Sequence, residues 1–186
     1  MVKIQDAEPA MSDGTNEPPT RPAILFLDFD GVLHPDQAYM HPTRGVVLKT
    51  ANLPPEYDHL DLFCYLPGLL TVLDESPDVR IVLSTSWVRV LGLEVTKDWL
   101  PSVMNERIIG ATYDCVQTPN WEHASRYRQI ADYINRMKLA GPWLAIDDDA
   151  QGWPEAERHH LVHTDETDGL NAPGTLDMLR QRLREL

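Results

Sequence analysis

The most constraining feature of this sequence is a run of five apolar residues that leads directly into two closely spaced acids. Residues 23–27 are apolar, and Asp28, Asp30 and Gly31 follow at once. Such a run is typical of a strand buried on both faces in a parallel sheet. Asp28 and Asp30 would then lie at the carboxyl edge of the sheet, where α/β proteins bind ligands. Gly31 would allow a sharp turn and the close approach of another group.

Two interpretations of this acid pair are open. Aspartates are common turn residues, so the simpler interpretation is a strand that ends in a turn. However, Asp28 and Asp30 are close enough to repel each other unless a cation lies nearby, and Mg²⁺ prefers carboxylate oxygens. The complete pattern, an apolar run followed by Asp-x-Asp-Gly, therefore favours a Mg²⁺ site.

The rest of the chain alternates between expected strands and helices. Strands are predicted at about 23–28, 80–83, 107–112, 143–146 and 160–163, and helices at about 66–73, 92–100, 124–138 and 174–185. This alternation predicts an α/β fold with a three-layer, doubly wound parallel sheet of Rossmann-like type. Residues 1–22 are polar and proline-rich and are expected to be a disordered leader, so residues 23–186 would form one domain.

Polar residues follow two further strands and begin one helix at the same predicted edge. Thr85 and Ser86 end the second strand, and Asp147 and Asp148 end the fourth. The helix at 124–138 follows a strand and should therefore begin at this edge. Its apolar stripe places Arg126 on the inner face and Arg128 toward solvent. A buried arginine needs an anionic partner, which a phosphate or the acid cluster would supply.

Residues 34–62 lack a clear period and contain four prolines. We expect a flap over the acid pair, with a short extended pair near 45–48, and a functional role because long loops in compact domains are rarely idle. The segment is too short to form a full cap domain. We therefore expect an open site whose selectivity comes from the flap and from a loop at 113–122.

Composition restricts the partners and the location. The formal net charge is −13 and the pI is about 4.8, which argues against loose binding to nucleic acid or anionic membrane but does not exclude a local basic pocket. Cys64 and Cys115 stand alone, and there is no apolar run long enough to span a membrane. We expect a cytoplasmic protein.

These motifs, taken in order, resemble the haloacid dehalogenase (HAD) superfamily of phosphohydrolases and phosphotransferases. The resemblance covers residues 23–171. It rests on four motifs: the apolar strand with Asp-x-Asp-Gly at 25–33, the strand ending in Thr or Ser at 82–86, Arg126, and the apolar strand with paired aspartates at 144–148. Runs at 81–87, 107–112 and 145–153 are similar to the small capless branch that includes the HAD domain of Swiss Army Knife RNA-repair proteins.

The resemblance implies a Mg²⁺-dependent phosphatase. It assigns Asp28 as the nucleophile that becomes an aspartyl phosphate, and Asp30 as the general acid and then the base. It assigns Mg²⁺ to Asp28, the carbonyl of Asp30, Asp148, and Asp147 directly or through water. It assigns phosphate binding to three residues on neighbouring elements, namely Thr85, Ser86 and Arg126.

Other interpretations remain beside this one. A non-catalytic phosphate-binding or interaction module on the same fold is the serious alternative. A response-regulator receiver is disfavoured, because its basic residue follows the last strand and its first two acids are adjacent. The substrate would be a phosphorylated small molecule or polymer end, including nucleic-acid ends. The histidines, His34 among them, show no metal-ligand spacing and are expected at the surface or in loops, and Trp87 in the core or lining the site.

Overall fold

The apolar run at the start of the domain forms the central strand of a five-stranded parallel sheet. The computed structural model describes residues 21–115 and 123–186. In it, β1 (Ile24–Leu27) pairs with β4 (Arg80–Leu83) on one side and β6 (Trp143–Asp147) on the other. The outer strands are β5 (Ile108–Ala111) and β7 (Leu161–His163), which gives the order β5-β4-β1-β6-β7.

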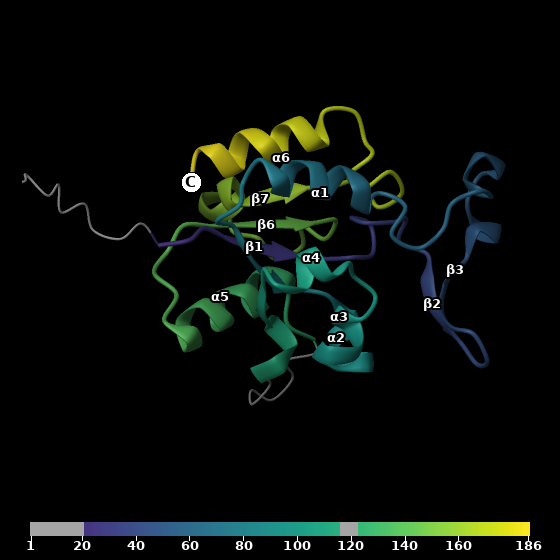
Figure 1. Ribbon diagram of the computed structural model, residues 1–186, viewed down its shortest axis with the longest axis horizontal. Helices are drawn as coiled ribbons and strands as arrows, with labels where there is room; N and C mark the ends of the chain where they lie inside the picture. The colour runs from purple at the N-terminus through teal and green to yellow at the C-terminus, as the bar shows by residue number, and fades with distance from the viewer. Residues whose placement is uncertain (1–20, 116–122) are drawn as a thin grey trace, which may run out of the picture.

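Helices cover both faces of this sheet, as Figure 1 shows. The helices α1 (Leu66–Asp74) and α6 (Thr175–Arg184) lie on one side, and α5 (Arg126–Met137) lies on the other. Because successive strand residues point to opposite faces, Leu25 and Leu27 pack with the α1 and α6 core, whereas Phe26 packs with the α5 core. The structure therefore confirms the predicted three-layer, doubly wound α/β fold.

The connection between β4 and β5 differs from the prediction. The helix expected at 92–100 is replaced by three short helices, α2 (Ser86–Leu91), α3 (Leu93–Lys97) and α4 (Ser102–Asn105). The first begins directly after β4 because Thr85 caps it, accepting a hydrogen bond from the backbone N–H of Trp87 at 3.4 Å. Gly92 then separates α2 from α3.

The segment predicted to form a flap contains an antiparallel hairpin. It comprises β2 (Ala38–His41) and β3 (Gly45–Leu48), followed by two 3₁₀ turns, η1 (Thr50–Asn52) and η2 (Pro55–Tyr57). The hairpin projects from the carboxyl end of the sheet (Figure 1). The extended pair expected near 45–48 is thus present and pairs with residues 38–41.

The base of this segment is held by the loop after β7. The backbone N–H of Asp36 donates to the carbonyl of Glu166 at 2.8 Å. The hydroxyl of Tyr57 donates to Oδ1 of Asp168 at 2.7 Å, and that of Tyr65 to the carbonyl of Thr167 at 3.0 Å. These contacts fix both ends of the hairpin segment to the same loop.

Two predicted segments lie mostly outside the described residues. The leader at 1–22 is described only at its last two residues, and the loop at 113–122 only as far as 115, where η3 (Thr112–Cys115) forms a 3₁₀ turn. A further 3₁₀ segment, η5 (Glu155–His160), precedes β7. Among the described residues, every helix is too short or too polar to cross a membrane.

Candidate active site

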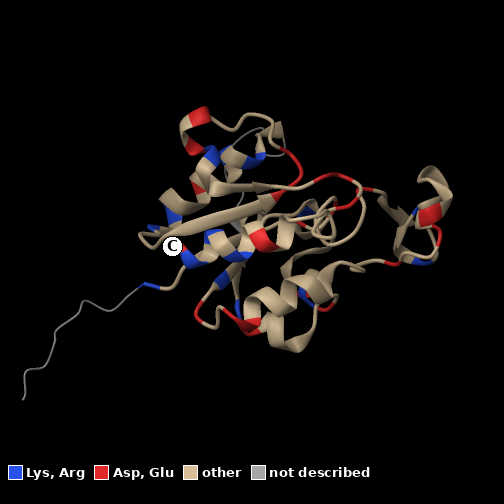
Figure 2. Cartoon of the chain, turned by 90° about the horizontal axis from the view of Figure 1, so that it is seen from above, with Lys and Arg blue, Asp and Glu red and all other residues tan. Residues whose placement is uncertain are grey.

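The carboxyl edge of the sheet brings together acids from two neighbouring strands. β1 ends directly before Asp28, and β6 ends at Asp147, so both acids lie beside the same strand pair. Figure 2 shows acidic segments at the ends of the strands that face the hairpin. Carboxylate oxygens of Asp28, Asp147 and Asp148 lie within 4.8 Å of one another.

Gly31 is what allows Asp148 to come this close. Its φ is +66°, a left-handed conformation that favours glycine. A Cβ atom at this position would lie 2.7 Å from Cβ of Asp148 and closer still to its carboxyl group. The hydroxyl of Thr164 also donates to the carbonyl of Gly31 at 2.7 Å, so the turn is held from the β7 side. The glycine therefore has the two roles that the sequence predicts for it.

Arg126 enters the same cluster from α5. Its Nη2 donates to Oδ2 of Asp28 at 2.7 Å, and its Nε lies 2.9 Å from Oδ2 of Asp147. Arg128 instead faces solvent, where Nε pairs with Asp132 at 3.2 Å. The structure thus places the two arginines on the faces that the apolar stripe indicates.

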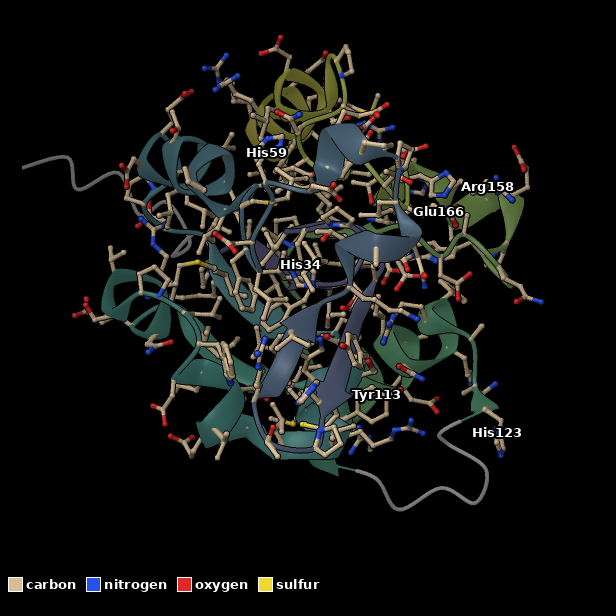
Figure 3. All side chains as sticks on the ribbon, turned by 90° about the vertical axis from the view of Figure 1, so that its right-hand side faces the viewer. His34, His59, Tyr113, His123, Arg158 and Glu166 are labelled. Atoms are coloured by element: carbon tan, nitrogen blue, oxygen red, sulfur yellow. The ribbon has the colours of Figure 1, made fainter. Side chains whose placement is uncertain are left out.

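Arg126 is itself braced by a buried amide. Its Nη1 donates to Oε1 of Gln129 at 3.3 Å, and Nε2 of Gln129 donates to the hydroxyl of Tyr113 and the carbonyl of Ala124, both at 3.1 Å. Figure 3 views the carboxyl edge of the sheet and labels Tyr113 on this side of the molecule. This network holds the guanidinium in one orientation, because its partners are fixed on two different elements.

Burial dominates the electrostatics of the cluster. It raises the pKa of Asp28, an effect that the charge of Arg126 only partly offsets. It also raises the pKa of Asp147 well above its ordinary value, and it raises that of Asp148 to about 7, with a further contribution from the charge of Asp28. Burial lowers the pKa of Arg126, but Asp28 and Asp147 outweigh this, so the arginine stays charged. One guanidinium therefore faces three carboxyl groups.

Asp30 lies apart from this cluster and has partners of its own. The indole Nε1 of Trp87 donates to Oδ2 of Asp30 at 3.0 Å, and Nε2 of His34 lies 3.1 Å from Oδ1. The backbone N–H of Phe63 donates to Nδ1 of His34 at 3.4 Å, which leaves Nε2 as the donor to Asp30. Two N–H groups thus fix the Asp30 carboxylate, which keeps 20% of its side chain exposed.

His34 lies in the loop between β1 and β2, as the sequence allows, but it is not at the surface. It is fully buried, and Figure 3 shows it near the centre of the view of this edge. The cause is the turn after β1, in which the N–H groups of Val32 and Leu33 both donate to the carbonyl of Phe29. Such a helical turn brings residues four apart to the same side, so His34 meets Asp30.

The end of β4 supplies the hydroxyl groups. Thr85 is fully buried, and its hydroxyl group lowers the pKa of Asp28 by hydrogen bonding, although this is weaker than the effects of burial and Arg126. Ser86 is half-buried beside Asp30. The hydroxyl of the neighbouring Ser84 is also buried but has no hydrogen-bond partner among the described residues. Thr85, rather than Ser84, is therefore the hydroxyl that acts on Asp28.

The cluster has the properties that a small divalent cation requires. Three carboxyl groups can each offer an oxygen, and Oδ2 of Asp147 is buried without accepting a hydrogen bond from any described residue, because the nearby Arg126 Nε–H is not aligned with it. Hard cations such as Mg²⁺ bind oxygen ligands of this kind, and a cation would relieve the repulsion that raises the acid pKa values. The donor set therefore fits Mg²⁺. The Asp30 carboxylate is not part of this group and is held by His34 and Trp87, so its assigned contribution is the backbone carbonyl.

The structure brings the predicted acids, Thr85, Ser86 and Arg126 to one edge of the sheet, and it adds two contacts to Asp30 that sequence reasoning missed. Trp87 was expected in the core or lining the site, and it is both buried and part of the site. Its hydrogen bond to Asp30 could not be predicted from any sequence pattern. The four-residue spacing between Asp30 and His34 predicts a contact only if the intervening residues form a helical turn, which the sequence does not indicate. Gln129 lies on the inner face of α5, where its spacing from Arg126 could have suggested the contact.

Acids at the ends of two parallel strands meet one buried arginine at the carboxyl edge of an α/β sheet, an arrangement suited to phosphoryl transfer. A comparison with protein families bears this out, because the family described as "HAD domain in Swiss Army Knife RNA repair proteins" matches residues 24–174, and the chain belongs to it. Comparisons with curated proteins and with solved structures find no match. Family membership supports hydrolase activity of the HAD phosphatase type.

Proposed function

We propose that this protein is a Mg²⁺-dependent phosphatase that hydrolyses phosphomonoesters, including phosphorylated nucleic-acid ends, through a phosphorylated Asp28. The observation that carries the proposal is the division of the acids. Asp28 lies with Asp147, Asp148 and Arg126, whereas Asp30 is held separately by His34 and Trp87. Nucleophilic attack and proton transfer need two carboxylates with such different surroundings.

Asp28 is oriented for attack on phosphorus. Its Oδ1 accepts a hydrogen bond from the backbone N–H of Phe29 at 2.7 Å, and its Oδ2 accepts one from Arg126 at the same distance. A carboxylate fixed in this way can form a bond to phosphorus while the bond to the leaving oxygen breaks. The same guanidinium can donate to a phosphate oxygen, as can the Thr85 hydroxyl and the Ser86 N–H.

Asp30 is placed to transfer the proton at both steps. In the first step it would donate a proton to the leaving oxygen, and in the second it would take one from the water that attacks the aspartyl phosphate and regenerates Asp28. His34 and Trp87 hold its carboxylate without closing it off from solvent. Asp28, Asp148 and the Asp30 carbonyl would hold Mg²⁺, with Asp147 binding directly or through water, and the ion would neutralise phosphate charge and shield the nucleophile from it.

The test is phosphate release from a panel of phosphomonoesters, including RNA with 3′- and 5′-phosphate ends, with Mg²⁺ and with a chelator. Asp28→Asn should lower kcat at least about 10³-fold, the scale of losing a nucleophile. Asp132→Asn, a surface change at the partner of Arg128, is the matched control and should keep wild-type activity. A wild-type protein that binds phosphate but hydrolyses nothing in the panel would support the non-catalytic alternative. Full turnover by Asp28→Asn would rule out the assigned nucleophile.

A further inference from the structure

A cavity of about 130 Å³ opens beside Asp30, between the hairpin and α2. Met40 and Val46 contribute to the hairpin side, and Trp87 and Val90 to the α2 side. Its lining also includes Tyr39, Asp30 and Ser86, of which Asp30 and Ser86 belong to the site described above. The cavity is therefore continuous with the place where Asp30 would protonate the leaving oxygen. Whatever carries that oxygen must lie on this side of the phosphate.

The size and lining of the cavity restrict what can occupy it. An enclosed protein cavity of about 150 Å³ holds one benzene molecule, and this cavity is similar in volume but open to solvent, so a flat ring can enter it from the open side. Exposed apolar side chains lie on both walls, namely Tyr39 and Met40 on the hairpin and Val90, with 61% of its surface accessible, on α2. Methionine sulfur makes favourable contacts with aromatic rings. An apolar rim beside an acid site thus fits a ring on the leaving group better than a small polyol.

The two walls of the cavity differ in charge from the chain as a whole. The full sequence has a formal net charge of −13, but the hairpin and α2 carry Arg44 and Arg89 and no acidic residue, and Lys49 follows the hairpin directly. Asp30 lines the cavity itself, and Asp58 and Asp61 lie beside β3. The cations of the walls offer partners for anionic groups beyond the phosphate at the acid site. A nucleic-acid strand has both a ring next to the leaving oxygen and further phosphate groups. A phosphotyrosine peptide has the ring but no further phosphates.

We propose that this cavity binds the base of the terminal nucleotide, whose sugar oxygen is the leaving group, while the hairpin contacts the neighbouring phosphates of the strand. This inference rests on the proposed phosphatase function, because that function is what places the leaving group on the Asp30 side of the phosphate. It adds a binding site and assigns substrate recognition to Met40, Val90 and Arg44.

Binding to the full-length Asp28→Asn variant tests the proposal without turnover. The probes are fluorescent tetranucleotides phosphorylated at the 3′ or the 5′ end, each made with its terminal base and as an abasic version with the same phosphates. Fluorescence anisotropy with Mg²⁺ present gives the Kd values. Since stacking of one base contributes strongly, at least one of the two ends should bind about 5-fold or more tighter when the base is present.

Changes at the walls should separate base binding from phosphate binding. Val90→Ser should reduce the preference for the base, whereas Val95→Ser, at an equally apolar residue of α3 with 49% exposure that does not line the cavity, should not. Arg44→Ala should weaken binding of intact and abasic probes by the same factor and lower the salt dependence by about one ion.

Equal Kd values for intact and abasic probes at both ends would overturn the proposal, and so would equal effects of the two valine changes. Tighter binding of a phosphotyrosine peptide than of any tetranucleotide would overturn its nucleic-acid part. Base-dependent binding by a protein whose wild type hydrolyses nothing would refute the proposed phosphatase function and still support the cavity, so the two failures are distinguishable.

Discussion

Gly31 offers a sharp test of how the metal-binding acids are positioned. Gly31→Ala places a side chain where φ is +66°, and left-handed geometry costs a residue with a Cβ about 1–2 kcal/mol. For a chain of this size that corresponds to a fall in melting temperature of about 2–8 °C. The new methyl group would also overlap the carboxyl group of Asp148, which must move. We therefore expect weaker Mg²⁺ binding in addition to lower stability.

Gly174→Ala is the matched control for backbone strain alone. Gly174 has a φ of +85°, but a Cβ atom there would meet nothing within 4 Å. Both variants should lose similar stability from strain in thermal unfolding. Only Gly31→Ala should show weaker Mg²⁺ binding by calorimetry and need more Mg²⁺ for half-maximal activity. If both variants bind Mg²⁺ like the wild type, Asp148 is not held in a cation site by the Gly31 turn, and our reasoning is wrong.

Three further predictions concern other parts of the site. Arg126→Ala should weaken inhibition by vanadate about 10-fold or more, the scale of a charge-assisted hydrogen bond, while Arg128→Ala should not; equal effects would reject the register of α5. Because folding raises the pKa of Asp148 from 3.8 to about 7, folding favours its protonated form, so without Mg²⁺ the melting temperature should fall as pH rises through this window. Mg²⁺ should then stabilise the protein more above this window than within it, and a melting temperature that rises with pH in its absence would contradict this. Replacing residues 40–58 with a short Gly/Ser linker should change substrate preference and KM more than Mg²⁺ affinity; loss of Mg²⁺ binding in a protein still folded by circular dichroism would show that the hairpin segment contributes to the metal site.

The central part of the fold was predictable because it obeys simple periodicities. An apolar run followed by acids indicates a buried parallel strand, and the shared carboxyl edge then brings Asp28 and Asp147 together without knowledge of the loops. Arg126 could be assigned to the inner face because α5 carries a regular apolar stripe. These inferences depend on one element at a time and on the direction in which parallel strands run.

The features that were missed depend on irregular local geometry. α2 has only six residues, and its valines continue the apolar character of β4, so a helix there has no visible period. Its start depends on the Thr85 cap, and that start is what brings the Trp87 indole to Asp30. His34 reaches Asp30 through a single helical turn, which is too short to leave a pattern. The two contacts to Asp30, from Trp87 and His34, therefore could be seen only in the structure.

The way in which the hairpin segment is anchored has a consequence for how this fold can change. Asp36 and Tyr65 lie on either side of the hairpin, and both are tied to the loop after β7 rather than to the hairpin itself. The hairpin at 38–48 can therefore grow or shrink without moving the strand ends that carry the acids, because Tyr57 and Phe63 lie beyond it and keep their contacts to Asp168 and His34. This is where insertions would be tolerated best during evolution. New substrate preferences could arise there while the chemistry at Asp28 and Asp30 stays unchanged.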